Sequence, residues 1–170
     1  MDEKLITPDS IVKKYMYWSM GAGFIPVPFL DFAAVMAVQL KMLSTLAKHY
    51  GVSFSENRGK EIVAALIGAA LPGNIAGSAL GSALKMIPVA GTIIGGVSVP
   101  LLAGATTFAV GKVFTQHFET GGTFLDFDVE KMKSHFQQEF EKGKSEAANV
   151  ASAASAAPPV EAAAGSPTKA

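Results

Sequence analysis

Two long apolar stretches dominate the pattern of hydrophobic and polar positions along this chain. They cover residues 62–84 and 86–111, contain no charged residue, and are separated only by Lys85. Each is about as long as the ~20 residues with which a helix crosses a bilayer. Glycine and proline interrupt both stretches, which is unusual for a simple membrane-spanning helix. The pattern therefore predicts an all-α protein that is closely packed and lies at or in a membrane.

Glycines recur at helical spacing within these stretches. A glycine inside a helix costs about 1 kcal/mol relative to alanine, and close approach of a neighbouring helix is the usual compensation. We therefore expect helix-packing roles for Gly73, Gly77, Gly81, Gly91, Gly95 and Gly111. The natural arrangement is a hairpin that turns at 85–88 and pairs the two glycine stripes. A buried helical core in a soluble protein could use the same stripes, so this alternative stays open.

Start and stop signals predict three helices before the second apolar stretch. Thr7 and Pro8 suit the beginning of a first helix, and the glycines and prolines of 21–28 interrupt it. A second helix is expected over 29–50, with a glycine C-cap at Gly51. The capping-box spacing of Ser53-Phe-Ser-Glu56 predicts the start of a third helix.

The first helix combines aromatic and basic side chains at neighbouring positions. Membrane–water interfaces favour tryptophan, tyrosine and lysine, whose amphipathic side chains anchor helices there. An amphipathic helix packed on a soluble core is an equally good interpretation. The candidate interface residues are Lys13, Lys14, Tyr15, Tyr17 and Trp18.

A further amphipathic helix is expected near the C-terminus. Asp126 or Asp128 would cap it, and Gly143 would end it. From residue 144 onward the chain is mostly alanine, serine and proline, a composition typical of a flexible tail with at most transient helix. We therefore divide the chain into an N-terminal cap (1–10), a helical domain (11–143) and a disordered tail (144–170).

Composition narrows the functional classes. Hydrophobic residues make up 49% of the chain, charged residues 16%, and the net charge is zero with Arg58 as the only arginine. Nucleic-acid binding proteins usually carry a basic surface, so we expect no nucleic-acid partner. The chain has no cysteine, which excludes disulfides and thiol chemistry. Its acidic first residues do not resemble a secretory signal, so we expect it on the cytoplasmic side.

Motifs for catalysis or cofactor binding are weak. The segment 104–112 ends in Gly-Lys but lacks the spacing and the following Ser or Thr of a phosphate-binding loop. The three histidines are far apart, and we predict no catalytic residue, cofactor or metal site. An enzyme would need titratable groups clustered around Asp31, Gln39 and Lys41, although Asp31 is better explained as a favourable charge in the first turn of a helix.

Three segments together resemble a known bacterial helical family, domain of unknown function 697. They are Ile-Pro-Val-Pro-Phe-Leu-Asp at 25–31, Val-Gln-Leu-Lys-Met at 38–42, and 46–52, which contains Tyr-Gly. The resemblance covers roughly residues 11–140. The positions that match its pattern are Pro26, Pro28, Asp31, Gln39, Lys41, Tyr50 and Gly51.

The resemblance implies an accessory module rather than an enzyme, because members of that family stand alone or are attached to P-loop GTPase domains and membrane segments. We therefore expect a non-enzymatic, membrane-associated helical module or scaffold that packs through its glycine stripes. Membrane lipid, a GTPase and a second copy of the chain are the expected partners. The alternative is a soluble cytoplasmic interaction or oligomerisation domain that uses the helix at 128–142.

Overall fold

The computed structural model describes residues 6–22, 30–70 and 99–156. Within these ranges the chain forms helices and no strand, which confirms the predicted all-α class. The helices are α1 (Pro8–Ala22), α2 (Leu30–Tyr50), α3 (Glu56–Ala70), α6 (Val99–Glu119) and α7 (Val129–Ala156).

Local signals in the sequence explain most helix ends. The backbone N–H of Ser10 donates to Thr7 Oγ1 at 3.2 Å, which caps α1. Gly51 ends α2 with φ of 68°, a conformation that glycine adopts without strain. The start of α3 differs from the prediction, because its first helical hydrogen bond runs from Gly59 N–H to the carbonyl of Ser55 rather than to a residue nearer Ser53.

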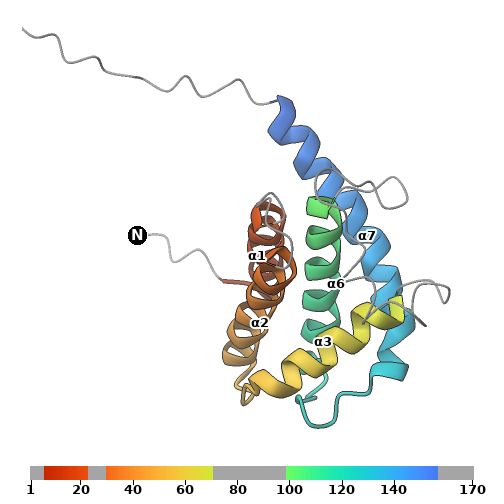
Figure 1. Ribbon diagram of the computed structural model, residues 1–170. Coiled ribbons are helices and arrows are strands. Elements are labelled where there is room, and N and C mark those ends of the chain that lie inside the picture. Colours follow the sequence, from red (N-terminus) through yellow and green to blue (C-terminus); the bar gives the residue numbers. More distant parts are fainter. Residues whose placement is uncertain (1–5, 23–29, 71–98, 157–170) are drawn as a thin grey trace, which may run out of the picture.

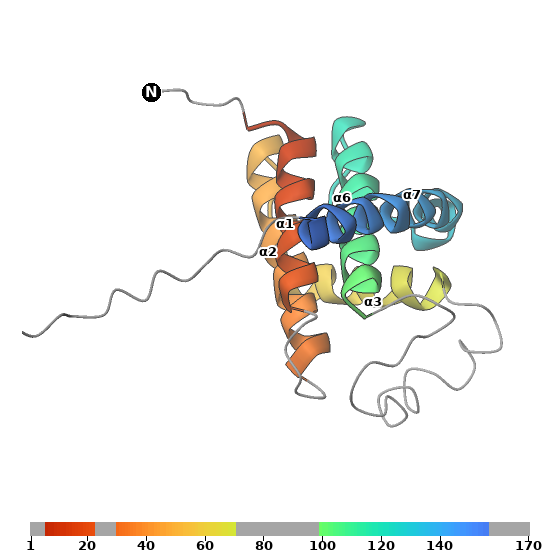
Figure 2. The same ribbon diagram turned by 90° about the horizontal axis from the view of Figure 1, so that it is seen from above.

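Helix α6 is the central element of the bundle. Helices α1 and α2 lie beside it, and α7 and α3 run across it (Figures 1 and 2). The most extensive packing joins α6 to α7 and to α1. This position explains the apolar sequence of α6, since a helix covered on several sides has little need of a polar face.

Small residues allow the neighbours of α6 to approach closely. A Cβ atom on Gly111 would lie 2.6 Å from a methyl group of Val12 and 3.0 Å from the sulfur of Met42. A Cβ atom on Gly104 would lie 2.7 Å from Met20. Gly111 thus lies against α1 and α2, and not against another glycine. The other glycines of the predicted stripes (Gly73, Gly77, Gly81, Gly91 and Gly95) lie outside the described residues, as does the predicted turn at 85–88.

The prediction that Gly143 ends the last helix is wrong. Helix α7 continues to Ala156, and Ala147 is fully buried. Gly143 is the point at which α7 meets α6, because its added Cβ would lie 2.8 Å from the carbonyl oxygen of Ala105. The predicted tail therefore begins with helix over 144–156, and its remainder, 157–170, lies outside the described residues.

Aromatic side chains fill the end of the bundle near the α6–α7 loop. Phe114 and Phe124 are fully buried, and the rings of Phe114 and Phe127 stack with centroids 4.6 Å apart. Phe118 completes the group with edge contacts to Phe114 and Phe124. We call these four residues the aromatic cluster. It joins α6 to the loop that leads into α7.

The lengths and hydropathies of the described helices bear on whether any of them could span a membrane. Among α1, α2, α3, α6 and α7, none is at once long enough and apolar enough to cross a membrane. The start of the first apolar stretch, 62–70, belongs to α3, where Ile62, Val63 and Leu66 are buried in the core. The end of the second stretch, 99–111, belongs to α6.

Candidate functional site

One face of α1 exposes two large aromatic side chains. Trp18 is 55% exposed and Tyr17 is 49% exposed, although large aromatic side chains are usually more buried than this. The ammonium group of Lys14 lies 5.2 Å from the Trp18 ring centroid, within cation–π distance. Residues at i, i+3 and i+4 share one side of a helix, so Lys14, Tyr17 and Trp18 form a single surface. We call it the α1 face.

The other two predicted interface residues are placed differently. Tyr15 is buried in the core, and its hydroxyl group forms a hydrogen bond with Thr45 Oγ1 at 3.0 Å. It does not belong to the α1 face, because the turn of the helix directs it toward α2. Lys13 is half-buried and pairs with Asp9 one turn earlier at 3.8 Å.

Gln39 is the centre of a buried polar network between three helices. Its side chain is fully buried, and Nε2 donates to Thr107 Oγ1 at 3.2 Å. The same Thr107 hydroxyl lies 2.7 Å from the hydroxyl of Ser19. These bonds connect α2, α6 and α1, while Oε1 of Gln39 has no hydrogen-bond partner among the residues that the structure describes. A buried polar group that loses its hydrogen bond raises the free energy of the folded state. The network therefore fixes how the three helices align along one another.

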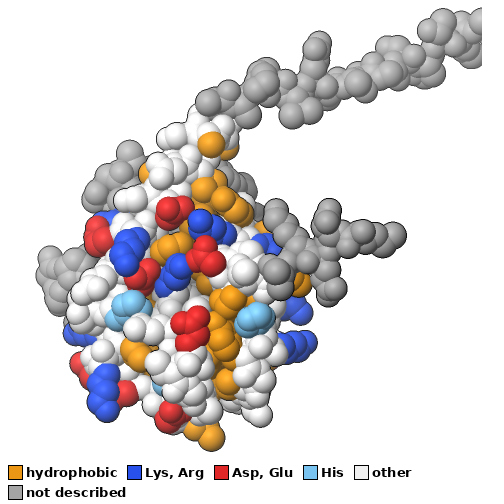
Figure 3. All heavy atoms as spheres, turned by 180° about the vertical axis from the view of Figure 1, so that it is seen from behind, with side chains coloured by type: hydrophobic (Ala, Val, Ile, Leu, Met, Phe, Trp, Pro, Cys, Tyr) orange, Lys and Arg blue, Asp and Glu red, His pale blue; other side chains and the backbone are white. Residues whose placement is uncertain are grey.

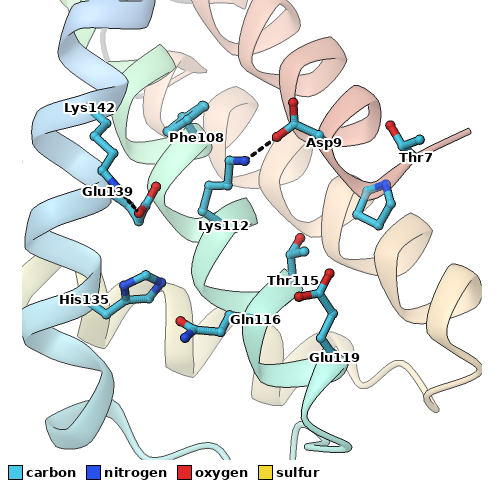
Figure 4. A pocket seen from close by; sticks show the side chains of 11 residues that line it. Thr7, Asp9, Phe108, Lys112, Thr115, Gln116, Glu119, His135, Glu139 and Lys142 are labelled. Carbon is cyan, nitrogen blue, oxygen red and sulfur yellow. Dashed lines mark hydrogen bonds and ion pairs between the residues drawn. The ribbon is translucent and has the colours of Figure 1, made fainter.

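A groove of about 470 Å³ lies between the start of α1, the second half of α6, and α7 (Figure 4). Charged side chains of both signs line it. Lys112 of α6 pairs with Asp9 of α1, and Lys142 donates to the buried carboxylate of Glu139 at 2.6 Å. The hydrogen bond from Lys112 lowers the pKa of Asp9 below its ordinary value, against the opposing effect of partial burial.

The charged side chains of the groove are mostly engaged with one another. Its lysines are engaged with carboxylates, as the dashed lines in Figure 4 show, and His135 lies apart from them on α7. In the described ranges, no three histidine, cysteine or acidic side chains are grouped as metal ligands would be. The surrounding surface intermixes acidic and basic side chains, with hydrophobic ones exposed between them (Figure 3). Such a groove suits a polar contact more than a reaction.

The four positions of the family resemblance whose side chains the structure describes do not meet at one site. Gln39 lies in the core, whereas Lys41 is exposed on α2. The hydroxyl of Tyr50 donates to Glu119 at 3.0 Å, and partial burial together with this bond raises its pKa to about 12. Gly51 is the α2 cap. Asp31 is in the first turn of α2, but its side chain, like Pro26 and Pro28, is outside the described part.

The sequence pattern did not predict the roles of Ser19, Thr107 and Glu139. Ser19 and Thr107 give no local signal, because they become partners only when helices 88 residues apart in the chain pack together. Glu139 lies on the amphipathic helix that was expected near the C-terminus, and it is buried where α7 faces α1 and α6 across the groove.

Comparison with known proteins identifies a relative and a family. Over 154 residues, covering 85% of this chain and 78% of the relative, the sequence is 41% identical to a Magnetospirillum gryphiswaldense (strain MSR-1) protein called magnetosome membrane protein 22. No solved structure matches the chain. A family model described as "Domain of unknown function (DUF697)" matches residues 8–145. The chain therefore belongs to this DUF697 family, as the resemblance predicted.

Proposed function

We propose that this protein is a non-enzymatic, membrane-associated helical module that meets the membrane surface through the α1 face. The exposure of Trp18 and Tyr17 beside Lys14 is the observation that carries this proposal. The relative whose name includes the words "membrane protein" supports the same location.

The chemistry of the α1 face suits the headgroup region of a bilayer. Indole and phenol rings have an apolar body and one polar group, and this combination favours the boundary between water and acyl chains. A lysine can keep its ammonium group in water or against lipid phosphate while its methylene stem lies on apolar surface. Both properties are present within two turns of α1.

A scaffold role follows from the way the polar groups are used. The buried hydroxyls and amide of the Gln39 network, and the charged pairs in the groove, join one helix to another and leave few polar groups free to act on a substrate. The close approach of Val12 to Gly111 supports a packing role for that glycine. We extend this role to Gly73, Gly77, Gly81, Gly91 and Gly95 on the sequence pattern. A P-loop GTPase partner is proposed on the family resemblance only.

Vesicle flotation with the full chain tests the α1 face. Removing both aromatic rings in Tyr17→Ser/Trp18→Ser should weaken binding to liposomes at least about ten-fold, because each ring loses apolar burial in the interface. The matched control is Ile6→Ser, which removes another exposed hydrophobic side chain, outside the α1 face. Equal binding by the double variant and the native chain would refute the proposed contact.

Cell fractionation tests the wider claim of membrane association. We expect the untagged protein in the membrane pellet. Release by carbonate would indicate a peripheral attachment such as the α1 face provides, and release only by detergent would indicate that further segments insert. Full recovery in the supernatant would contradict membrane association and favour the soluble interaction domain.

A further inference from the structure

The loop between α6 and α7 presents a leucine to solvent. Leu125 is 81% exposed, the highest value among the exposed large hydrophobic side chains of the described residues. Its neighbours Phe124 and Phe127 are buried in the aromatic cluster. The loop is therefore fastened on both sides of the leucine and leaves only that side chain outside.

Hydrogen bonds and glycines hold the loop in one shape. The carboxylate of Asp126 accepts from the backbone N–H of Thr123 at 2.6 Å and from its hydroxyl. Nε2 of His117 lies 2.8 Å from the carbonyl oxygen of Thr123. Gly121 has φ of 84°, and a Cβ on Gly122 would lie 2.4 Å from the His117 ring. A fixed apolar side chain loses little entropy on binding, which favours its use as an anchor.

A groove that could receive such an anchor lies between α2 and the start of α3. It measures about 620 Å³, and Ala33, Met36, Ala37 and Leu40 form its apolar floor. The alanines leave the floor hollow because they have no more than a methyl group. Glu56 and Lys60 on its rim pair with each other at 2.7 Å, which leaves Lys41 as the lining charge that has no ion pair within the described residues.

The charges around the leucine and around the groove are complementary. Asp126 and Asp128 follow Leu125 with side chains that are 61% and 45% exposed, and Asp128 also pairs with Lys131 at 3.3 Å. Hydrogen bonds from Thr123 and from Lys131 lower the pKa values of Asp126 and Asp128 respectively, so both stay ionised at neutral pH. An acidic rim around the apolar knob thus matches a basic group beside the apolar hollow. The same acidic rim would be repelled by an anionic bilayer.

The leucine and the groove lie at the same end of the molecule. Phe54 lines the groove and also packs edge-on against Phe124, with ring centroids 5.6 Å apart. Two copies related by a two-fold axis could therefore make both contacts at once. Such a reciprocal contact is the commonest form of homodimer.

We propose that Leu125 of each copy inserts into the α2–α3 groove of a second copy of this chain, with Asp126 near the partner's Lys41. The contact is small beside the 1,200–2,000 Å² that stable interfaces usually bury. The dimer is accordingly weak and concentration-dependent, and confinement of the copies to one membrane would favour it. The proposal stands independently of the α1 face.

Sedimentation velocity of the full chain over a range of concentrations tests the proposal, in detergent if extraction requires it. Leu125→Asp removes the knob, and Ala37→Glu fills the groove while repelling Asp126. Each variant alone should associate at least about ten-fold more weakly than the native chain. An equimolar mixture of the two should recover part of the association, because the heterodimer keeps one intact knob in one intact groove while its second contact carries both substitutions.

Matched controls separate this contact from general effects of charge. Ile6→Asp changes another exposed aliphatic side chain, and Ala65→Glu changes an exposed alanine of α3 outside the groove. Both should associate like the native chain. Leu125→Ala serves as a milder second variant, with helicity checked by circular dichroism for every protein.

Any one of four results would overturn the proposal. The native chain could remain monomeric at all concentrations, both variants could associate as well as the native chain, or the mixture could fail to recover association. Loss of liposome flotation by Leu125→Ala with unchanged self-association would also overturn it, and would assign the leucine to the membrane. None of these results depends on whether Tyr17 and Trp18 bind lipid, so this proposal and the proposed function can fail separately.

Discussion

The two halves of α6 are packed in different ways. Its first half carries small and hydroxyl-bearing residues, including Gly104, which leaves room for side chains of α1 and α7, and Thr107, which bonds with Ser19 of α1. Its second half carries Phe114 and Phe118, which fill space around the α6–α7 loop. The first half thus depends on close approach and alignment, and the second half depends on volume.

This difference predicts that the two halves respond to different kinds of substitution. Removing atoms should damage the second half most, whereas adding atoms or removing a hydroxyl should damage the first. The free energy of unfolding, measured by denaturant titration of the full chain, is the common quantity for the tests below.

The largest effect is expected from Phe114→Ala. Phe114 is fully buried and contacts three other rings, so its truncation removes apolar burial and leaves a cavity. We expect a loss of about 3–5 kcal/mol. Phe54→Ala is the control, because Phe54 lies at the exposed edge of the same group. Equal losses for the two variants would show that the cluster contributes no more than surface burial.

An added methyl group should test the first half. In Gly143→Ala the new Cβ would meet the backbone of Ala105, which cannot rotate away, so we expect a loss of about 1–3 kcal/mol. The control is Gly21→Ala, where nothing lies within 4 Å and the higher helix propensity of alanine should leave stability unchanged or raised by up to about 1 kcal/mol. A stabilised Gly143→Ala variant would contradict close packing of α7 on α6.

The smallest effect is expected from Thr107→Val, which keeps the shape but removes a hydroxyl group. Ser19 and Gln39 would then lose a buried partner, at a cost of about 0.5–1.5 kcal/mol. Thr120→Val is the control, since that hydroxyl bonds only to carbonyl groups of its own helix end. If both variants unfold at the same denaturant concentration as the native chain, the Gln39 network contributes nothing to stability.

Local signals made part of the fold predictable. Helix ends were predictable from Pro8, Gly51 and the aspartates before α7, because capping depends on residues that are close in the sequence. Gly143 misled the prediction, since a glycine that stops a helix and one that admits a neighbouring helix look alike in a sequence. The burial of Tyr15 and the meeting of Ser19, Gln39 and Thr107 follow from tertiary packing, which no local pattern specifies. The glycine stripes of 73–95 remain predictions.

The pairing of α1 with α6 also has a consequence for synthesis of the chain. Asp9 and its partner Lys112 are 103 residues apart, so α1 and α2 leave the ribosome long before α6. At about 5–20 residues per second the delay is roughly 5–20 s. During this time the faces of α1 that carry Ile11, Val12 and Met16 have no α6 to cover them. The nascent chain therefore passes through an interval in which a chaperone or a lipid surface can bind what the finished bundle conceals.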